Sequence, residues 1–128
     1  MEGGLEMKIT FSFGKNWRNY VKNVVDEKVI QEAKDSLLKY LPESKFKNKV
    51  FIDVGCGSGL FSLSAILLGC KHVISFDIDP ASIEATLLLK EKFSHILPSN
   101  YLWDIFQGNI LDNNLVESLK EKGDIVYS

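Results

Sequence analysis

The fold of this chain is decided by the stretch Val50-Phe51-Ile52-Asp53-Val54-Gly55-Cys56-Gly57-Ser58-Gly59-Leu60. Its first half is a continuous β-branched and aromatic run, which is typical of a strand buried on both faces of a parallel sheet. Its second half alternates glycine with other residues, a pattern that predicts a sharp turn into a helix, with backbone N–H groups left free at the helix mouth. Such a mouth binds a group that is anionic or strongly polar.

Helix and strand alternate after the glycine turn. Residues Leu60–Leu68 are apolar on nearly every side and predict a buried helix, for which Gly69 is a natural C′ stop. A second strand, His72–Asp77, follows after a very short connection, so the unit is a right-handed parallel βαβ. The pair Asp79-Pro80 combines a good N-cap with proline at the first helical position, and we expect a helix from there to about Phe93.

The two ends of the chain carry weaker patterns. Residues 101–107 predict a third strand, Asp112 caps a short helix, and Ile125–Tyr127 begins a fourth strand. Between Trp17 and Leu41, apolar residues follow an i, i+3, i+4, i+7 stripe, which predicts one or two amphipathic helices that end at Pro42. The chain therefore has the helix-strand order of an α/β protein.

Four segments resemble, in order, the motifs of the class I S-adenosylmethionine-dependent methyltransferases. The segment Asp53–Gly59 resembles motif I, an acidic residue and any residue followed by G-x-G-x-G. The ribose-binding, adenine-binding and fourth-strand motifs are resembled by Val73–Pro80, Phe106–Ile110 and Asp124–Ser128. The resemblance covers about residues 48 to 128, and it implies a Rossmann-like three-layer sandwich with a parallel sheet.

That family fold has seven strands in the order 3-2-1-4-5-7-6, of which this sequence supplies 3-2-1-4. We therefore expect an N-terminal part of a methyltransferase of the small-molecule type, truncated relative to the family fold. In it, residues 1–41 form an aromatic arm and amphipathic helix, and residues 48–128 form the cofactor-binding half of the domain. The fourth strand would be an unpaired edge, which predicts possible self-association, and the chain alone would be inactive because the substrate half is missing.

The resemblance implies a role for each residue of the glycine turn. Glycines at 55, 57 and 59 let the backbone turn beneath S-adenosylmethionine, and together with Cys56 they present N–H groups to its carboxylate end. Asp53, at the end of its strand, would meet the cofactor ammonium directly or through water. Its alternative role is to accept hydrogen bonds from the glycine-turn amides only.

The other expected cofactor contacts come from the second and third strands. Asp77 lies where a doubly wound fold places a carboxylate that accepts from two ribose hydroxyls, and Ile78 would pack on one face of the adenine. The family usually has Gly-Asp in its third motif, where this chain has Asn109 after glycine. Asn109 can still accept from the adenine amino group, although a plain turn residue is the alternative, and Ile110 would offer its backbone N–H.

Two other functions compete with the methyltransferase. A NAD-type dinucleotide-binding domain also has a glycine-rich first turn, but its G-x-G-x-x-G fingerprint requires glycine where this chain has Leu60. A non-catalytic, methyltransferase-like scaffold would keep the glycine turn only for folding. A binding measurement separates the scaffold from the enzyme, because only the enzyme requires that the cofactor bind and that Asp77 hold it.

The aromatic segment Phe11–Trp17 has two interpretations. It is either an arm that covers a hydrophobic surface or a lid, since it resembles the N-terminal segment that closes over the cofactor in several small-molecule methyltransferases. In the lid, Trp17 and Tyr20 would line the pocket.

Composition limits the remaining possibilities. The formal net charge of −2 and the charged content of 25% indicate an ordinary soluble protein with no basic excess for nucleic acid. We expect no membrane span, a cytoplasmic location, free thiols at Cys56 and Cys70, and no metal site. Neither His72 nor His95 is placed as a general base, so the catalytic residue is unknown, and the expected partner is a small-molecule methyl acceptor.

Overall fold

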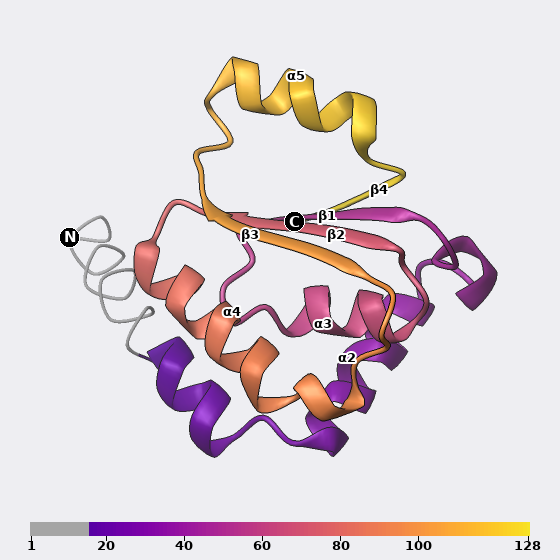
Figure 1. Cartoon of the computed structure of the whole chain (residues 1–128), viewed down its shortest axis with the longest axis vertical. Helices are drawn as coiled ribbons and strands as arrows, with labels where there is room; N and C mark the ends of the chain where they lie inside the picture. Colours follow the sequence, from indigo (N-terminus) through magenta and orange to yellow (C-terminus); the bar gives the residue numbers. More distant parts are fainter. Residues whose placement is uncertain (1–15) are drawn as a thin grey trace.

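The computed structural model describes residues 16–128, which form a four-stranded parallel sheet with helices on both sides (Figure 1). The strand order is β3-β2-β1-β4, as predicted. The strands are β1 (Val50–Val54), β2 (His72–Asp77), β3 (Leu102–Gln107) and β4 (Ile125–Tyr127). The strands thus have the order and parallel direction expected for a Rossmann-like sheet.

The helices divide unequally between the two faces of the sheet. Figure 1 shows α2, α3 and α4 on one side and α5 on the other. Their bounds are α2 (Glu27–Leu38), α3 (Leu60–Leu67), α4 (Pro80–Lys92) and α5 (Asn113–Lys122). Residues 16–23 are also helical, and short 3-10 turns occupy Glu43–Lys45 and Ser94–Ile96. Within residues 16–128, no helix combines the length and the apolar character that a membrane crossing requires.

Helix ends follow the predicted signals with one refinement. The side chains of Asp79 and Asp112 cap α4 and α5, and Gly69 adopts a φ of 109° after α3. The amphipathic stripe near the N-terminus is two helices, because Asp26 accepts a hydrogen bond from the Val29 N–H at 2.9 Å and starts a new helix.

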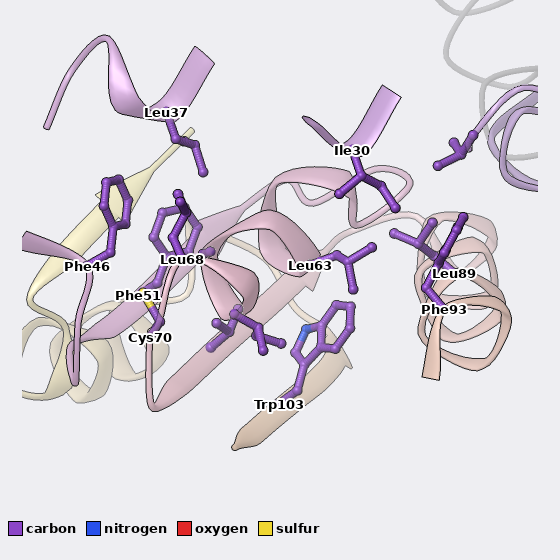
Figure 2. Packing of buried hydrophobic residues seen from close by; sticks show 14 of the residues in the cluster. Ile30, Leu37, Phe46, Phe51, Leu63, Leu68, Cys70, Leu89, Phe93 and Trp103 are labelled. Atoms are coloured by element: carbon purple, nitrogen blue, oxygen red, sulfur yellow. The ribbon is translucent and has the colours of Figure 1, made fainter. Parts of the chain in front are cut away.

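Most of the core lies between the sheet and its three-helix face (Figure 2). Leu63 of α3, Leu89 of α4 and Trp103 of β3 belong to this cluster, as does Ile30 of α2. A smaller cluster on the other face joins the sheet to α5 through Ile52, Ile74, Phe76 and Leu119. Burial on both faces explains why β1 reads as a continuous apolar run and why the middle of β2 is buried throughout, whereas β3 and β4 are partly exposed.

Parallel pairing brings the carboxyl ends of the strands to one edge. In the register, Val54 of β1 lies beside Phe76 of β2, and Asp77 lies beside Gln107 of β3. The sheet reverses its order between β1 and β4, which is where open α/β sheets bind ligands. β4 is an outer strand of this sheet. Self-association through this strand stays a prediction.

Candidate functional site

The glycine turn after β1 is held in place by β2. Gly55, Gly57 and Gly59 have positive φ values of 71°, 56° and 82°. The Gly55 and Cys56 N–H groups both donate to the Phe76 carbonyl, at 2.9 and 3.1 Å. The backbone conformation therefore needs glycine at these positions, and the turn is fastened to the neighbouring strand.

Asp77 joins the tips of the first two strands directly. Its Oδ2 accepts a hydrogen bond from the Gly57 N–H at 3.1 Å, and its Oδ1 accepts from the Asp79 N–H at 3.0 Å. The glycine turn and the carboxylate after β2 thus belong to one constellation, as the sequence predicts.

A cavity of about 300 Å³ lies on one side of the turn. Asp53, Gly55, Cys56 and Gly57 line it, together with four aromatic side chains: Trp17, Tyr20, Phe61 and Tyr127. The Phe61 and Tyr127 rings lie 4.9 Å apart between centroids. The cavity is therefore lined by bare backbone, one carboxylate and aromatic side chains.

Trp17 lies directly against the glycine turn. A Cβ built on Gly57 would come within 3.1 Å of the indole atoms Cε2 and Cζ2. The expectation that Trp17 and Tyr20 line the pocket agrees with this geometry. Residues Phe11 to Lys15 of the predicted arm or lid lie outside the described residues.

A second cavity of about 370 Å³ lies beyond the tips of β2 and β3. It shares Gly55 with the first cavity, and Asp77, Ile78, Asn109 and Ile110 line it. Ile78 and Ile110 are 62% and 48% exposed, respectively, which is unusual for isoleucine and leaves apolar surface open to a ligand. Eight of the nine predicted cofactor contacts therefore line one of two adjoining cavities.

Gly59 is the exception among the predicted contacts. It lines neither cavity, and a Cβ at this position would lie 2.6 Å from Cγ2 of Thr86 on α4. Glycine here permits close packing of α4 beneath the turn.

The side chain of Asn109 already has a local partner. Its Oδ1 accepts a hydrogen bond from the Leu111 N–H at 2.9 Å, which forms an Asx turn. In this conformation Asn109 therefore acts as a turn residue. A hydrogen bond from an adenine amino group would have to use the second lone pair of the same oxygen.

Asp53 is a buried carboxylate with an unusual acidity. Burial is the main cause that raises its pKa to about 6, and the negative charge of Asp77 raises it further. A hydrogen bond from the Ser62 hydroxyl at 2.6 Å lowers the pKa and offsets part of this rise. Asp53 is thus ionised at neutral pH and protonates in mildly acidic solution.

The remaining candidates for reactive groups have structural partners. Burial raises the pKa of the Cys56 thiol to about 12, so this thiol stays protonated and is no nucleophile. His72 Nε2 lies 2.7 Å from Asp104 Oδ2, far from the carboxyl edge of the sheet. Among residues 16–128 there is no group of three His, Cys, Asp or Glu side chains arranged to hold a metal.

The sequence analysis missed several residues at the site. Phe61 and Tyr127 line the first cavity, and the Thr86 hydroxyl donates to the Gly57 carbonyl at 3.1 Å. Thr86 lies in a helix that also has Ser82, Glu84, Lys90 and other polar residues, so nothing in the sequence distinguished its hydroxyl as a buried partner of the turn.

The chain matches a known family over most of its length. Residues 33–126 match the family model described as ribosomal protein L11 methyltransferase (PrmA).

Curated relatives of the chain have the same name. The ribosomal protein L11 methyltransferase of Psychrobacter sp. (strain PRwf-1) is 35% identical over 114 residues, which is 71% of this chain and 37% of the relative. Its counterpart in Legionella pneumophila (strain Paris) is 53% identical over 49 residues, or 38% of this chain and 17% of the relative. The chain thus spans well under half the length of these relatives.

Solved structures share the fold at lower identity. Magnesium protoporphyrin IX methyltransferase (ChlM) from Synechocystis PCC 6803, solved with bound SAH, has a TM-score of 0.54 at 20% identity. The match covers 80% of this chain and 51% of that one. Protein arginine methyltransferase 10 of Arabidopsis thaliana has a TM-score of 0.51 at 18% identity, covering 66% of this chain and 22% of that one. These two structures support the fold.

The predicted small-molecule methyl acceptor is wrong. The relatives are named for a ribosomal protein as their acceptor. The prediction failed because motifs of the cofactor half are shared by methyltransferases with very different acceptors, so they carry no information about the acceptor.

Proposed function

The chain belongs to the ribosomal protein L11 methyltransferase (PrmA) family, and on that basis we propose that it is the S-adenosylmethionine-binding part of a protein methyltransferase. One observation carries this proposal: Asp77 Oδ2 accepts from the Gly57 N–H at 3.1 Å, at the junction of two cavities that share Gly55. A carboxylate and a bare backbone turn therefore lie side by side, with space on either side of them.

The two cavities suit the two ends of such a cofactor. The first offers Asp53 to an ammonium group. The expected free N–H groups of the turn are not available to a carboxylate in this conformation, because those of Gly55 and Cys56 donate to the Phe76 carbonyl and that of Gly57 donates to Asp77. The second offers Asp77 to ribose hydroxyls and the exposed faces of Ile78 and Ile110 to an adenine ring. In this arrangement the cofactor spans Gly55, where a side chain would obstruct it.

Aromatic side chains line the cavity that would hold the sulfonium end of the cofactor. S-adenosylmethionine supplies an activated methyl group on a cationic sulfur, and the rings of Phe61 and Tyr127 line the same cavity as Asp53. Aromatic faces attract cations, so these residues favour the charged cofactor and exclude water from it. The protein then contributes mainly proximity and orientation to an in-line displacement.

A protein acceptor follows from the names of the relatives, and we assign it to the full-length protein. Incubation of the full-length protein with ribosomal protein L11 and methyl-labelled S-adenosylmethionine should label L11. Absence of label on L11, with label on another substrate, would reject this acceptor while leaving the cofactor site intact.

Calorimetric titration with S-adenosylhomocysteine tests the cofactor site. We expect one-to-one binding that Asp77→Ala weakens at least tenfold, because the substitution removes the ribose acceptor and the bond that shapes the turn. The matched control is Asp104→Ala, which removes an exposed carboxylate on β3 that is paired with His72 instead. NAD should give no binding heat. Equal affinity in wild type and Asp77→Ala would contradict the proposal, and so would tighter binding of NAD.

A further inference from the structure

A chain of hydrogen bonds crosses the interior of the protein and ends at Asp53. The Trp103 Nε1–H donates to Ser75 Oγ at 2.8 Å, and Ser75 Oγ lies 2.6 Å from Ser62 Oγ. The Ser62 hydroxyl donates to Asp53 Oδ2 at 2.6 Å. The four residues come from β3, β2, α3 and β1, so the chain connects three strands and a helix.

All four members are buried, and only one borders a cavity. Ser62 and Ser75 have no exposed surface, and Asp53 is 3% exposed. Asp53 lines the first cavity, whereas Ser62, Ser75 and Trp103 do not line it. The hydroxyls therefore influence a ligand only through the Asp53 carboxylate.

The two ends of the chain set its direction. An indole N–H donates only, so Ser75 accepts from Trp103 and has one hydroxyl hydrogen left to donate. Ser62 uses its own hydrogen for Asp53, which makes Ser75 the donor of the bond to Ser62. Each hydroxyl in turn accepts one bond and donates one, and every donor points toward Oδ2.

We propose that Trp103, Ser75 and Ser62 are positioning residues of the cofactor site, which hold the Asp53 carboxylate in place and in its charged form for a cationic group in the first cavity. This proposal rests on the proposed cofactor site. In the reversed direction, a protonated Asp53 would donate to Ser62, and Ser62 would donate to Ser75. Ser75 would then accept from both Trp103 and Ser62, so its own hydroxyl hydrogen would have no acceptor among these residues. The arrangement thus favours a fully ionised acceptor at its end.

The charged and titratable groups around Asp53 are few. Asp77 at the end of β2 opposes the charge of Asp53, whereas Cys56 of the turn and Tyr127 of β4 are neutral because their pKa values are raised. Tyr20 lines the same cavity and also has a raised pKa. Helix α3 contributes no titratable side chain, so its contribution to the charge of Asp53 comes from the Ser62 hydroxyl.

The first test measures the charge of Asp53 without any ligand. In ligand-free full-length protein, the side-chain carbon resonance of Asp53 should titrate at a higher pH in Ser62→Ala than in wild type, by about one pH unit. Ser64→Ala is the matched control, since Ser64 is equally buried on the same helix but donates to the Leu60 carbonyl. An unchanged midpoint in Ser62→Ala, or an equal change in Ser64→Ala, would overturn the proposal.

A double-mutant comparison tests whether the bonds act in series. Ser75→Ala should raise the midpoint by less than Ser62→Ala, and it should add nothing in the Ser62→Ala background, because it acts through Ser62. Additive shifts would instead show two independent effects. Trp103→Phe applies the same test to the first donor of the hydrogen-bond chain. If this variant does not fold, the comparison of the two serine variants still tests the proposal.

The second test measures the consequence for binding. Calorimetric affinity for S-adenosylhomocysteine should fall as the pH drops through the Asp53 midpoint, and the fall should begin at higher pH in Ser62→Ala. At high pH the two proteins should bind alike within about threefold. Loss of affinity by the same factor at every pH would indicate a merely structural role and overturn the proposal. If the wild-type protein does not bind S-adenosylhomocysteine at any pH, the proposed function is rejected. The ligand-free titration of Asp53 would still test the hydrogen-bond chain in that case.

Discussion

At the scale of single residues, Asp53 links the stability of the protein to pH. Its pKa is about 6 in the folded state against 3.8 for the ordinary group, so the folded state binds more protons than the unfolded state between these values. The stability contributed by this group is therefore present below pH 4 and is lost as the pH rises to about 6. The ionised carboxylate that suits a cation thus destabilises the fold above pH 6.

Asp53→Asn should remove that loss. Between pH 4 and pH 7 the free energy of unfolding of the variant, relative to wild type, should rise by up to about 3 kcal/mol. Chemical denaturation at a series of pH values measures this difference. Parallel curves for the two proteins would show that Asp53 has an ordinary pKa.

The sequence predicted the residues whose position follows from chain direction alone. Asp53 and Asp77 each lie at the carboxyl end of a parallel strand, so their meeting at one edge needed only the strand assignment. It did not predict the bond from Ser62 to Asp53, because that bond depends on the rotation of α3 against β1. The same limit hid Phe61 and Tyr127, whose rings meet only after α3 and β4 are packed.

At the scale of elements, the glycine turn connects β1 to α3 and packs against α4. Gly55 has no atom within 4 Å of an added Cβ, whereas at Gly59 the Cβ would meet Thr86. Gly55→Ala should therefore cost about 1–2 kcal/mol of stability from its positive φ alone, and Gly59→Ala about 2–4 kcal/mol because overpacking is added. Thermal or chemical denaturation of both variants measures the contrast.

The Thr86→Ser background separates the two causes at Gly59. It removes the clashing methyl group and keeps the hydroxyl that donates to Gly57, so Gly59→Ala should be less harmful there. Equal costs for the two glycines in wild type would contradict the packing account.

The helix at residues 16–23 is attached to α4 by a lysine and by an ion pair. Lys92 Nζ donates to the carbonyls of Val21 and Val25, each at 2.7 Å. Val21 lies in the last turn of the helix, and Val25 lies two residues beyond its end. An ion pair between Arg18 and Glu84 at 3.2 Å adds a second link to α4. This attachment keeps Trp17 against the glycine turn.

Lys92→Met should loosen that helix and cost about 1–3 kcal/mol, because charged donors leave the last carbonyls. Hydrogen exchange should accelerate in residues 16–25 and stay unchanged in β1. Lys120→Met, which removes an exposed lysine on α5, should have no such effect. Uniformly faster exchange in both variants would argue against a specific fastening by Lys92.

Element types were predictable where a strong periodicity coincided with a cap. The caps at Asp79 and Asp112 gave the starts of α4 and α5, and Gly69 gave the stop after α3. The end of α2 was less accurate: the helix stops at Leu38, although Pro42 was expected to end it. Proline sets the furthest point a helix can reach, and packing decides where it stops earlier.

At the scale of the whole molecule, the described residues form the proposed cofactor site, and none of them identifies the methyl acceptor. The chain spans 37% of the Psychrobacter sp. relative and 17% of the Legionella pneumophila one. The strand order β3-β2-β1-β4 places both cavities around the switch point between β1 and β4. The correct fold and the wrong acceptor have one cause, because every motif recognised in the sequence belongs to the fold and the proposed cofactor site.

The central claim is that the two cavities on either side of Gly55 bind one molecule, a sulfonium nucleoside or its demethylated product. Amide chemical shifts during titration with S-adenosylhomocysteine test it most directly. We predict that the amides of Gly57 and Tyr127 in the first cavity and of Ile78 and Ile110 in the second shift together, with a single dissociation constant. Shifts confined to one cavity, or two unrelated dissociation constants, would contradict the account.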